Sequence, residues 1–250
     1  FPEIAAWARE HPEMDLGVHL TLTSEWKFYR WRPVTPFDRV PGIIDEEGFL
    51  WRHVPDVVQH ASAEEVEAEM RAQIERALQF GLRPTHLDSH MGTLFARLDF
   101  FEAYVKLSRE YGIPAMLPKP TPGQLEAEGV DPRIAQRLPE LESEGFLLLD
   151  RLVTRAGGKT YEERKENFYN IIRGLEPGVT QLIVHLNGSD EEASNISYSW
   201  QQRYYEFMLC TSIETRSLLE EEGVRLIGYR PLAEVWAAHV SQGGRTEEAR

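Results

Sequence analysis

Cysteine, basic residues and long apolar runs are all scarce in this sequence. The single cysteine, Cys210, excludes an internal disulfide framework and suits a reducing compartment, so we expect a cytoplasmic protein. No apolar run approaches the roughly 20 residues that a membrane-spanning helix requires. Only 27 Lys and Arg residues stand against 41 Asp and Glu residues, and the net charge of -14 argues against nucleic acid or an anionic membrane as the main partner.

The sequence has ample material for a hydrophobic core, with 42% hydrophobic and 10% aromatic residues. Helical and extended patterns alternate along most of the chain, which is typical of parallel βαβ units in a single domain, here residues 1–250. The segment around 119–145 is charged and polar with little periodicity, so we expect a variable excursion there. Helices are predicted over 1–12, 62–80, 98–111, 161–175 and 199–221, strands over 14–23, 112–118, 146–150, 179–185 and 224–229, and a small hairpin over 42–51.

The predicted helix over 62–80 carries the clearest signals. Ser62 and Glu65 form a capping box at its start, and Gly81 ends it. Its apolar residues recur at helical spacing and predict a buried stripe of Val66, Met70, Ile74, Ala77 and Leu78.

A glycine-rich phosphate-binding loop is missing from the sequence. Instead, residues suited to catalysis or metal binding follow several of the predicted strands. In a parallel barrel the carboxyl ends of all strands meet on one rim. The α/β pattern therefore favours a barrel over an open sheet.

Histidines lie at or just after strand-like segments in three parts of the chain. His86, Asp88 and His90 occupy alternate positions, so in an extended segment their side chains point to the same side. His19 and His185 stand in similar settings on other strands. Two structural alternatives remain open here, namely a surface loop that happens to hold two histidines and a core histidine satisfied by its neighbours.

Neutral imidazoles and carboxylates are the usual ligands of Zn²⁺ and similar ions. His86 and His90 are four residues apart, or roughly 13 Å in a straight strand, whereas metal ligands lie about 2.0–2.2 Å from the ion. The two histidines can share an ion only if the chain bends sharply after Asp88. Otherwise one binds metal and the other handles protons or substrate.

The segment from Ser24 to Pro33 is rich in aromatic residues, among them Trp26, Tyr29 and Trp31. An aromatic face flanked by hydrogen-bonding groups suits a sugar ring, so these three residues are candidates for substrate binding. Packing of the loop onto its own domain is an equal alternative.

Four segments make the sequence resemble the YdjC-like family of carbohydrate deacetylases, which includes chitooligosaccharide deacetylases. The segments are Asp15 to Thr23, Thr85 to His90, Val184 to Gly188 and Gly228 to Leu232. The first two motifs are specific when taken together, and the third is degenerate.

The resemblance implies a distorted TIM-like (β/α) barrel, one divalent metal ion (magnesium or zinc) and hydrolysis of the N-acetyl group of an amino sugar or chitooligosaccharide. His19, His86 and His90 match the family's histidine motifs and are the implied metal ligands. The family's metal-binding Asp-Asp pair has no counterpart before His19, so we expect it on a first strand encoded before Phe1. The family's late His-Pro-Gly motif also differs here, where His185 is followed by leucine and asparagine.

The expected reaction is metal-assisted amide hydrolysis. His185 is the candidate that protonates the departing amine, because an imidazole titrates near neutral pH. Asp88 is the second candidate catalytic residue and is expected to orient a metal-bound histidine. The alternatives are a phosphoesterase on the same barrel, for which Lys27, Arg30 and Arg83 would supply positive charge, and a sugar-binding protein without a metal. Whether the chain forms a homo-oligomer is left open.

Overall fold

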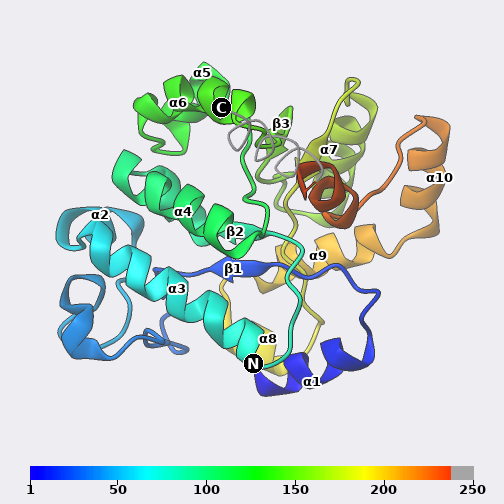
Figure 1. The fold of residues 1–250 in the computed structure, drawn as a ribbon. Coiled ribbons are helices and arrows are strands. Elements are labelled where there is room, and N and C mark those ends of the chain that lie inside the picture. Colours follow the sequence, from blue (N-terminus) through cyan, green and yellow to red (C-terminus); the bar gives the residue numbers. More distant parts are fainter. Residues whose placement is uncertain (238–250) are drawn as a thin grey trace. The chain divides into compact units, whose positions relative to one another are not determined.

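The computed structural model describes residues 1–237, apart from the side chains of Pro122 and Gln124 (Figure 1). The chain divides into two compact units. The second unit consists of Trp26–Tyr29 and Leu149–Ile227, and the first consists of Phe1–Glu25, Arg30–Leu148 and the segment from Gly228 onward. Helices and parallel strands occur in both units, which confirms the α/β class.

The described strands form two parallel pairs, β1 (Val18–Leu20) with β2 (Leu87–Ser89) and β3 (Arg151–Val153) with β4 (Thr180–Leu182). These sheets are too small to make a closed barrel by themselves, so the TIM-like barrel and the single domain stay predictions. Within residues 1–237, no helix is both long enough and apolar enough to cross a bilayer.

The helices predicted over 1–12, 62–80 and 98–111 are present in the first unit, whereas its other helices were not predicted. Helices α3 and α4 pack against each other, and α3 also contacts β1 (Figure 1). The elements besides the strands are α1 (Pro2–Glu10), η1 (Phe37–Arg39), η2 (Pro41–Ile43), α2 (Val54–His60), α3 (Ala63–Gln79), η3 (His90–Phe95), α4 (Leu98–Tyr111), α5 (Pro122–Ala127) and α6 (Pro132–Ser143), and residues 230–237 are also helical.

The core of the first unit forms from the predicted apolar faces. Four residues of the predicted α3 stripe are buried, whereas Leu78 is 40% exposed. Leu20 and Leu22 bury the apolar face of the first strand segment, and α4 adds three large side chains. The fully buried aromatic residues of α4 are Phe100, Phe101 and Tyr104.

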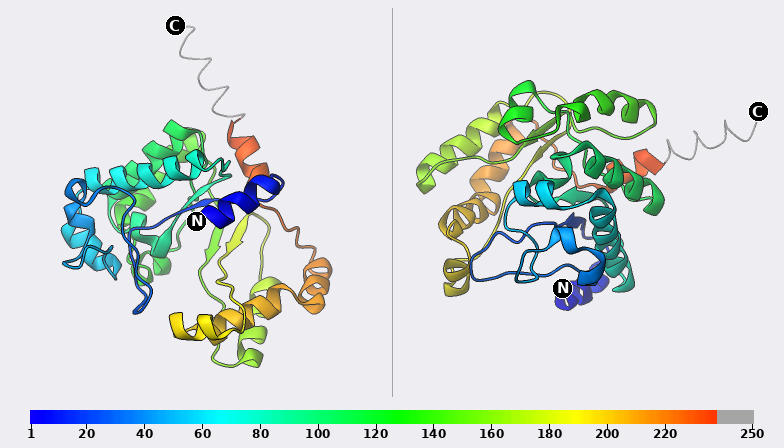
Figure 2. Two further views of the ribbon diagram at one scale, coloured as in Figure 1. Left: turned by 90° about the horizontal axis from the view of Figure 1, so that it is seen from below. Right: turned by 90° about the vertical axis from the view of Figure 1, so that its left-hand side faces the viewer.

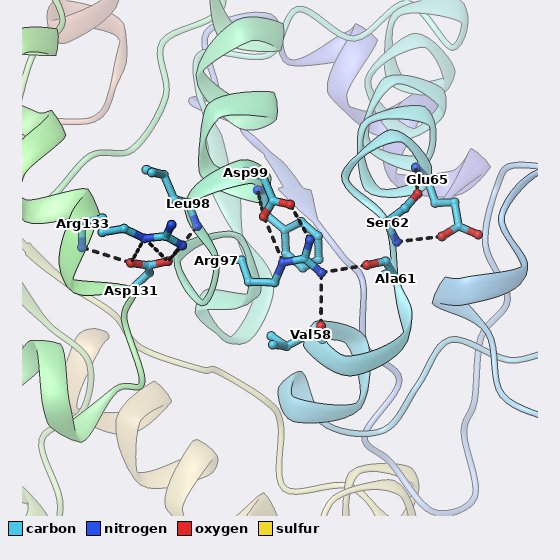
Figure 3. Close-up of polar contacts among 10 residues, drawn as sticks. Val58, Ala61, Ser62, Glu65, Arg97, Leu98, Asp99, Asp131 and Arg133 are labelled. Atoms are coloured by element: carbon cyan, nitrogen blue, oxygen red, sulfur yellow. Dashed lines mark hydrogen bonds and ion pairs between the residues drawn. The ribbon is translucent and has the colours of Figure 1, made fainter.

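Side-chain hydrogen bonds join the helix ends of this unit (Figure 3). Ser62 and Glu65 form the predicted capping box of α3. Arg97 donates to the carbonyl oxygens of Val58 and Ala61 at the end of α2, at 3.1 and 2.8 Å, and pairs with Asp99 in the first turn of α4. These bonds satisfy backbone groups that helix termini leave without partners.

The start of α4 is also joined to α6. The carboxylate of Asp131, the N-cap residue of α6, accepts a 3.1 Å hydrogen bond from the amide of Leu98 and a 3.0 Å bond from the amide of Arg133 (Figure 3). The same carboxylate pairs with the Arg133 guanidinium. One aspartate therefore anchors the beginnings of two helices.

In the second unit, helices accompany the parallel β3–β4 pair (Figure 2), and a small hydrophobic core lies among three of them. The helices are α7 (Tyr161–Arg173), α8 (Glu191–Ile196), α9 (Trp200–Cys210) and α10 (Ile213–Glu221). The buried hydrophobic residues of this core are Phe168, Tyr169, Ile172, Leu209 and Leu218.

Three predicted strands differ from the structure. In the run over 146–150 only Leu149 forms a single bridge, and the β3–β4 pairing begins at Arg151. The segment 112–118 holds two single bridge residues, Ala115, which pairs in parallel with Leu87, and Pro118, and 224–229 contains no strand. An apolar run shows that a segment is buried, but strand pairing also needs a partner edge, which the run does not specify.

Two predictions about helices also need correction. The segment around 119–145, where no helix was predicted, contains α5 and α6, and α6 buries Ile134 and Leu138 in the core. Its character as a variable excursion stays a prediction. The buried residues of α6, Ile134, Leu138 and Leu141, recur at helical spacing, so the sequence held a signal that the prediction overlooked. The single helix predicted over 199–221 is two helices, because Ser212 caps α10 by accepting from the amide of Thr215. The predicted hairpin over 42–51 is present as one antiparallel bridge between Ile44 and Leu50.

Candidate active site

Four polar side chains of the first unit lie in one chain of close contacts beside the β1–β2 pair, which we call the histidine cluster (Glu25, His90, His19 and Asp88). His19 Nδ1 lies 2.9 Å from Asp88 Oδ2. His19 Nε2 lies 3.1 Å from His90 Nδ1, and His90 Nε2 lies 3.0 Å from Glu25 Oε2. Every ring nitrogen of the two histidines is therefore engaged within the cluster.

Backbone geometry explains this convergence. The parallel register places His19 directly opposite Asp88 on the neighbouring strand. After His90 the chain turns through Met91 and Gly92, whose φ angles of 53° and 65° lie in the left-handed region. Glycine adopts this conformation readily, whereas methionine seldom does. The sharp bend therefore follows His90 rather than Asp88.

The strand segment that carries His19 is held from α3. The side-chain amide of Gln73 accepts from the Thr21 amide at 2.9 Å and donates to the Thr21 carbonyl at 2.7 Å. Gln73 in turn donates to the fully buried Glu69, at 2.8 Å. The Glu69 carboxylate also accepts from the amides of Val34 and Thr35, both at 2.9 Å. A buried polar network thus anchors the backbone beside the cluster.

The cluster lies partly in contact with solvent. The side chains of Glu25, His90 and Asp88 are 19%, 18% and 20% exposed, whereas that of His19 is 52% exposed. The Trp31 ring stands edge-on to His90, with 6.3 Å between the ring centroids. The outer histidine is therefore accessible while its partners are sheltered.

The facing nitrogens of His19 and His90 are close enough to bind one metal ion. Ligand atoms about 2.0–2.2 Å from one ion can lie at most about 4.4 Å apart, and the observed separation is 3.1 Å. However, no three or more His, Cys, Asp or Glu side chains among residues 1–237 are arranged to hold a metal. The two histidines therefore fit as part of a metal site, not as a complete one.

His86 lies on the same side of the β2 segment but makes different contacts. Its ring stacks on Tyr229, with centroids 3.8 Å apart and planes 14° from parallel, and its Nδ1 lies 3.1 Å from the Thr85 hydroxyl. A Cβ atom at Gly17 would lie 2.5 Å from the ring, so only glycine fits beside it. Burial lowers the pKa of His86, although the charges of Asp88 and Asp15 oppose this shift. The histidine in contact with His19 is thus His90, and His86 as a metal ligand stays a prediction.

The three predicted sugar-binding aromatics are divided between the two units. Trp26 and Tyr29 belong to the second unit, with ring centroids 6.1 Å apart, and the Arg203 guanidinium of α9 lies 5.7 Å from the centre of the Trp26 ring. Tyr29 is 57% exposed. Trp31 belongs to the first unit and packs against its core, so packing accounts for part of its role.

His185 follows β4 in the second unit and is exposed. Its backbone amide donates a 2.8 Å hydrogen bond to Glu206, whose other oxygen pairs with Arg164 at 2.5 Å. This buried pair holds the backbone of the predicted catalytic residue. The role of His185 as a proton donor stays a prediction.

Comparison with known proteins assigns the chain to a family. The family model described as "YdjC-like protein" matches residues 1–221. The chain belongs to the YdjC-like family. It is 33% identical to a carbohydrate deacetylase of Thermus thermophilus over 216 residues, which cover 86% of this chain and 77% of that protein. A carbohydrate deacetylase of Thermoanaerobacter pseudethanolicus is 24% identical over 87% of this chain and 78% of its own length.

A solved structure shares the fold of this YdjC-like chain. It is a protein of Enterococcus faecalis V583, named as a candidate cellobiose-phosphate cleavage protein. The TM-score is 0.73 at 26% sequence identity, and the match covers 93% of this chain and 83% of that one. The resemblance seen in the sequence motifs is therefore confirmed at the level of the family.

Two acidic residues of this YdjC-like chain, Asp15 and Glu25, lie in positions that the sequence motifs did not predict. Asp15 lies away from the histidine cluster, where it accepts hydrogen bonds from the Thr85 hydroxyl and, at 2.9 Å, from the Arg230 amide. Glu25 belongs to the cluster, although no sequence motif singles it out. The available signal was a carboxylate directly after the strand that carries His19. The Asp-Asp pair expected before Phe1 lies outside these residues and stays a prediction.

Proposed function

We propose that this YdjC-like chain is a metal-dependent carbohydrate deacetylase that hydrolyses the N-acetyl group of an amino sugar or chitooligosaccharide. The observation that carries the proposal is the 3.1 Å approach of His19 Nε2 and His90 Nδ1, with a carboxylate on each remaining ring nitrogen. Ligand histidines in metalloproteins commonly donate their other N–H to a carboxylate. The names of the curated relatives support the reaction class.

In this mechanism His19 and His90 would hold a divalent ion, magnesium or zinc. When bound, such an ion supplies a Lewis acid that acidifies water and polarises the acetyl carbonyl. Asp88 orients the His19 imidazole through its outer nitrogen. Water adds its oxygen to the acetyl carbon, the C–N bond breaks, and acetate and an amine are released. His185 is the residue assigned to give the amine nitrogen its proton.

The substrate is expected to bind through aromatic stacking. Trp26 and Tyr29 offer neighbouring rings, and Arg203 beside Trp26 adds hydrogen-bond donors for hydroxyl groups. Aromatic surface bordered by polar groups matches the two faces of a sugar ring.

The test uses purified protein stripped of metal and then supplied with zinc or magnesium. We expect acetate release from N-acetylated chitooligosaccharides only after metal is added, and loss of this activity in His19→Ala and His90→Ala. His53→Ala, an exposed histidine outside the cluster, is the matched control and should keep full activity. Equal activity with and without metal would refute metal dependence, and sugar binding without turnover would support the non-catalytic alternative.

The Enterococcus faecalis relative is named for the cleavage of a phosphorylated disaccharide, without a statement of which bond breaks, and a phosphoesterase is kept as the second candidate. The same assay should therefore include a phosphorylated disaccharide and should measure inorganic phosphate as well as acetate. Phosphate release that depends on His19 and His90 would favour this candidate over the deacetylase.

A further inference from the structure

We propose that Glu25 is a positioning residue, which holds the His90 imidazole so that its Nδ1 lone pair faces the Nε2 lone pair of His19. This inference deepens the proposed function and rests on it for the nature of the bound ion. The starting observation is the 3.0 Å contact between Glu25 Oε2 and His90 Nε2.

A count of protons in the cluster leads to this role. A neutral imidazole carries one N–H, and an ionised carboxylate can only accept hydrogen bonds. Asp88 therefore places the N–H of His19 on Nδ1, and Glu25 places the N–H of His90 on Nε2. The two nitrogens that remain, 3.1 Å apart, then both present lone pairs.

Two lone pairs at this distance cannot form a hydrogen bond with each other. A positive ion between them satisfies both, and two ionised carboxylates at the ends of the chain favour positive charge at its centre. Removing either carboxylate releases one imidazole to rotate or change tautomer, and the matched pair of acceptors is then lost. Glu25 thus fixes the tautomer of His90 in the same way as Asp88 fixes that of His19.

The backbone of the loop that carries Glu25 is held by the neighbouring residue, Ser24. The Ser24 amide donates to the Trp51 carbonyl at 2.7 Å, and the Ser24 hydroxyl accepts from the Trp31 amide at 3.0 Å. Ser24 itself is fully buried. A variant at position 25 is therefore expected to fold.

The first measurement is zinc affinity, determined by calorimetric titration of the purified protein. We expect Glu25→Ala to weaken zinc binding about 10- to 100-fold, as is typical when the carboxylate partner of a ligand histidine is removed. Glu46→Gln, which removes a negative charge from an exposed loop position, is the control and should bind zinc like the parent. A Glu25→Ala protein with parental zinc affinity would overturn the proposal.

A double variant separates positioning from direct binding. If Glu25 acts through His90, then Glu25→Ala adds no further loss of zinc affinity in a His90→Ala background. If Glu25 instead contributes its own bond to the ion, the loss persists in that background, and the positioning role is wrong.

The second readout is independent of metal and of activity. Long-range ¹H–¹⁵N spectra of the metal-free protein report which ring nitrogen of each histidine carries the proton. We expect His90 to hold its proton on Nε2 in the parent and to lose this single state in Glu25→Ala. The same tautomer in both proteins would refute the inference. If the parent fails to bind any divalent ion, the proposed function fails, while the spectra still decide the role of Glu25.

Discussion

Glu206 of α9 and Arg164 of α7 form an ion pair in which both side chains are only 9% exposed. Glu206 Oε1 accepts from Arg164 Nη1 at 2.5 Å, and its Oε2 accepts from the His185 amide at 2.8 Å. Arg164 also donates to the Gly158 carbonyl at 2.9 Å, while its Nε is buried without a partner among the described residues. Glu206→Gln would leave a buried guanidinium charge without its counter-ion. We expect this change to lower the free energy of unfolding by about 3 kcal/mol, because broken buried pairs cost about 3–5 kcal/mol and glutamine keeps one acceptor.

Urea denaturation followed by circular dichroism measures this loss. Glu214→Gln is the matched control. Glu214 of α10 pairs with Lys165, which lies next to Arg164 on α7, but the Glu214 side chain is 61% exposed. Exposed pairs contribute about 0–1 kcal/mol, so the control should unfold almost like the parent. The double variant Arg164→Met with Glu206→Leu should recover most of the loss, since it removes both charges together. A Glu206→Gln protein within about 1 kcal/mol of the control, a threshold set by the exposed pair, would refute the reasoning.

Three further changes probe other parts of the chain. Hydrogen bonds from Arg133 lower the pKa of Asp131 to about 2, so the stabilisation is present above the ordinary value of 3.8 and is lost as pH falls toward 2. Asp131→Asn should therefore lower the free energy of unfolding by about 1–2 kcal/mol at neutral pH and weaken its dependence on pH between about pH 4 and 2. An unchanged dependence of the unfolding free energy on pH would contradict this role of Asp131. Trp26→Ala should weaken chitooligosaccharide binding by about 1–2 kcal/mol in calorimetry with little change in melting temperature, and a loss of stability at unchanged affinity would return the loop to a packing role. Gly228→Ala should destabilise the protein by about 1–3 kcal/mol in thermal unfolding, because the added Cβ would collide with the carboxylate of Asp15; parental stability would show that this contact relaxes easily.

Local signals in the sequence predicted several of the longer helices, among them α3, α4 and α7. The start of α3 followed from Ser62 and Glu65, whose capping box is present, and α4 lies where its apolar spacing placed it. Such signals succeed because caps and 3.6-residue periodicity act between residues a few positions apart. The break at Ser212 and the helix α6 were missed although both carry local signals, an N-cap serine in the first case and the N-cap Asp131 with a regular apolar face in the second.

By itself, the sequence determined the acidic character, the α/β class, the family motifs and the strand segments that carry the histidines. Alternation along an extended chain also indicated that His86, Asp88 and His90 share one side of their segment. These features depend on composition and on neighbours along the chain, which a sequence displays directly.

Only the tertiary structure decided which of these groups meet. The parallel register set His19 opposite Asp88, and the left-handed turn after His90 placed that histidine, rather than His86, against His19. It also added Glu25, which no motif had marked. Contacts between residues about 70 positions apart depend on how strands pair and where the backbone turns, and these are outcomes of the whole packed chain rather than of any local pattern.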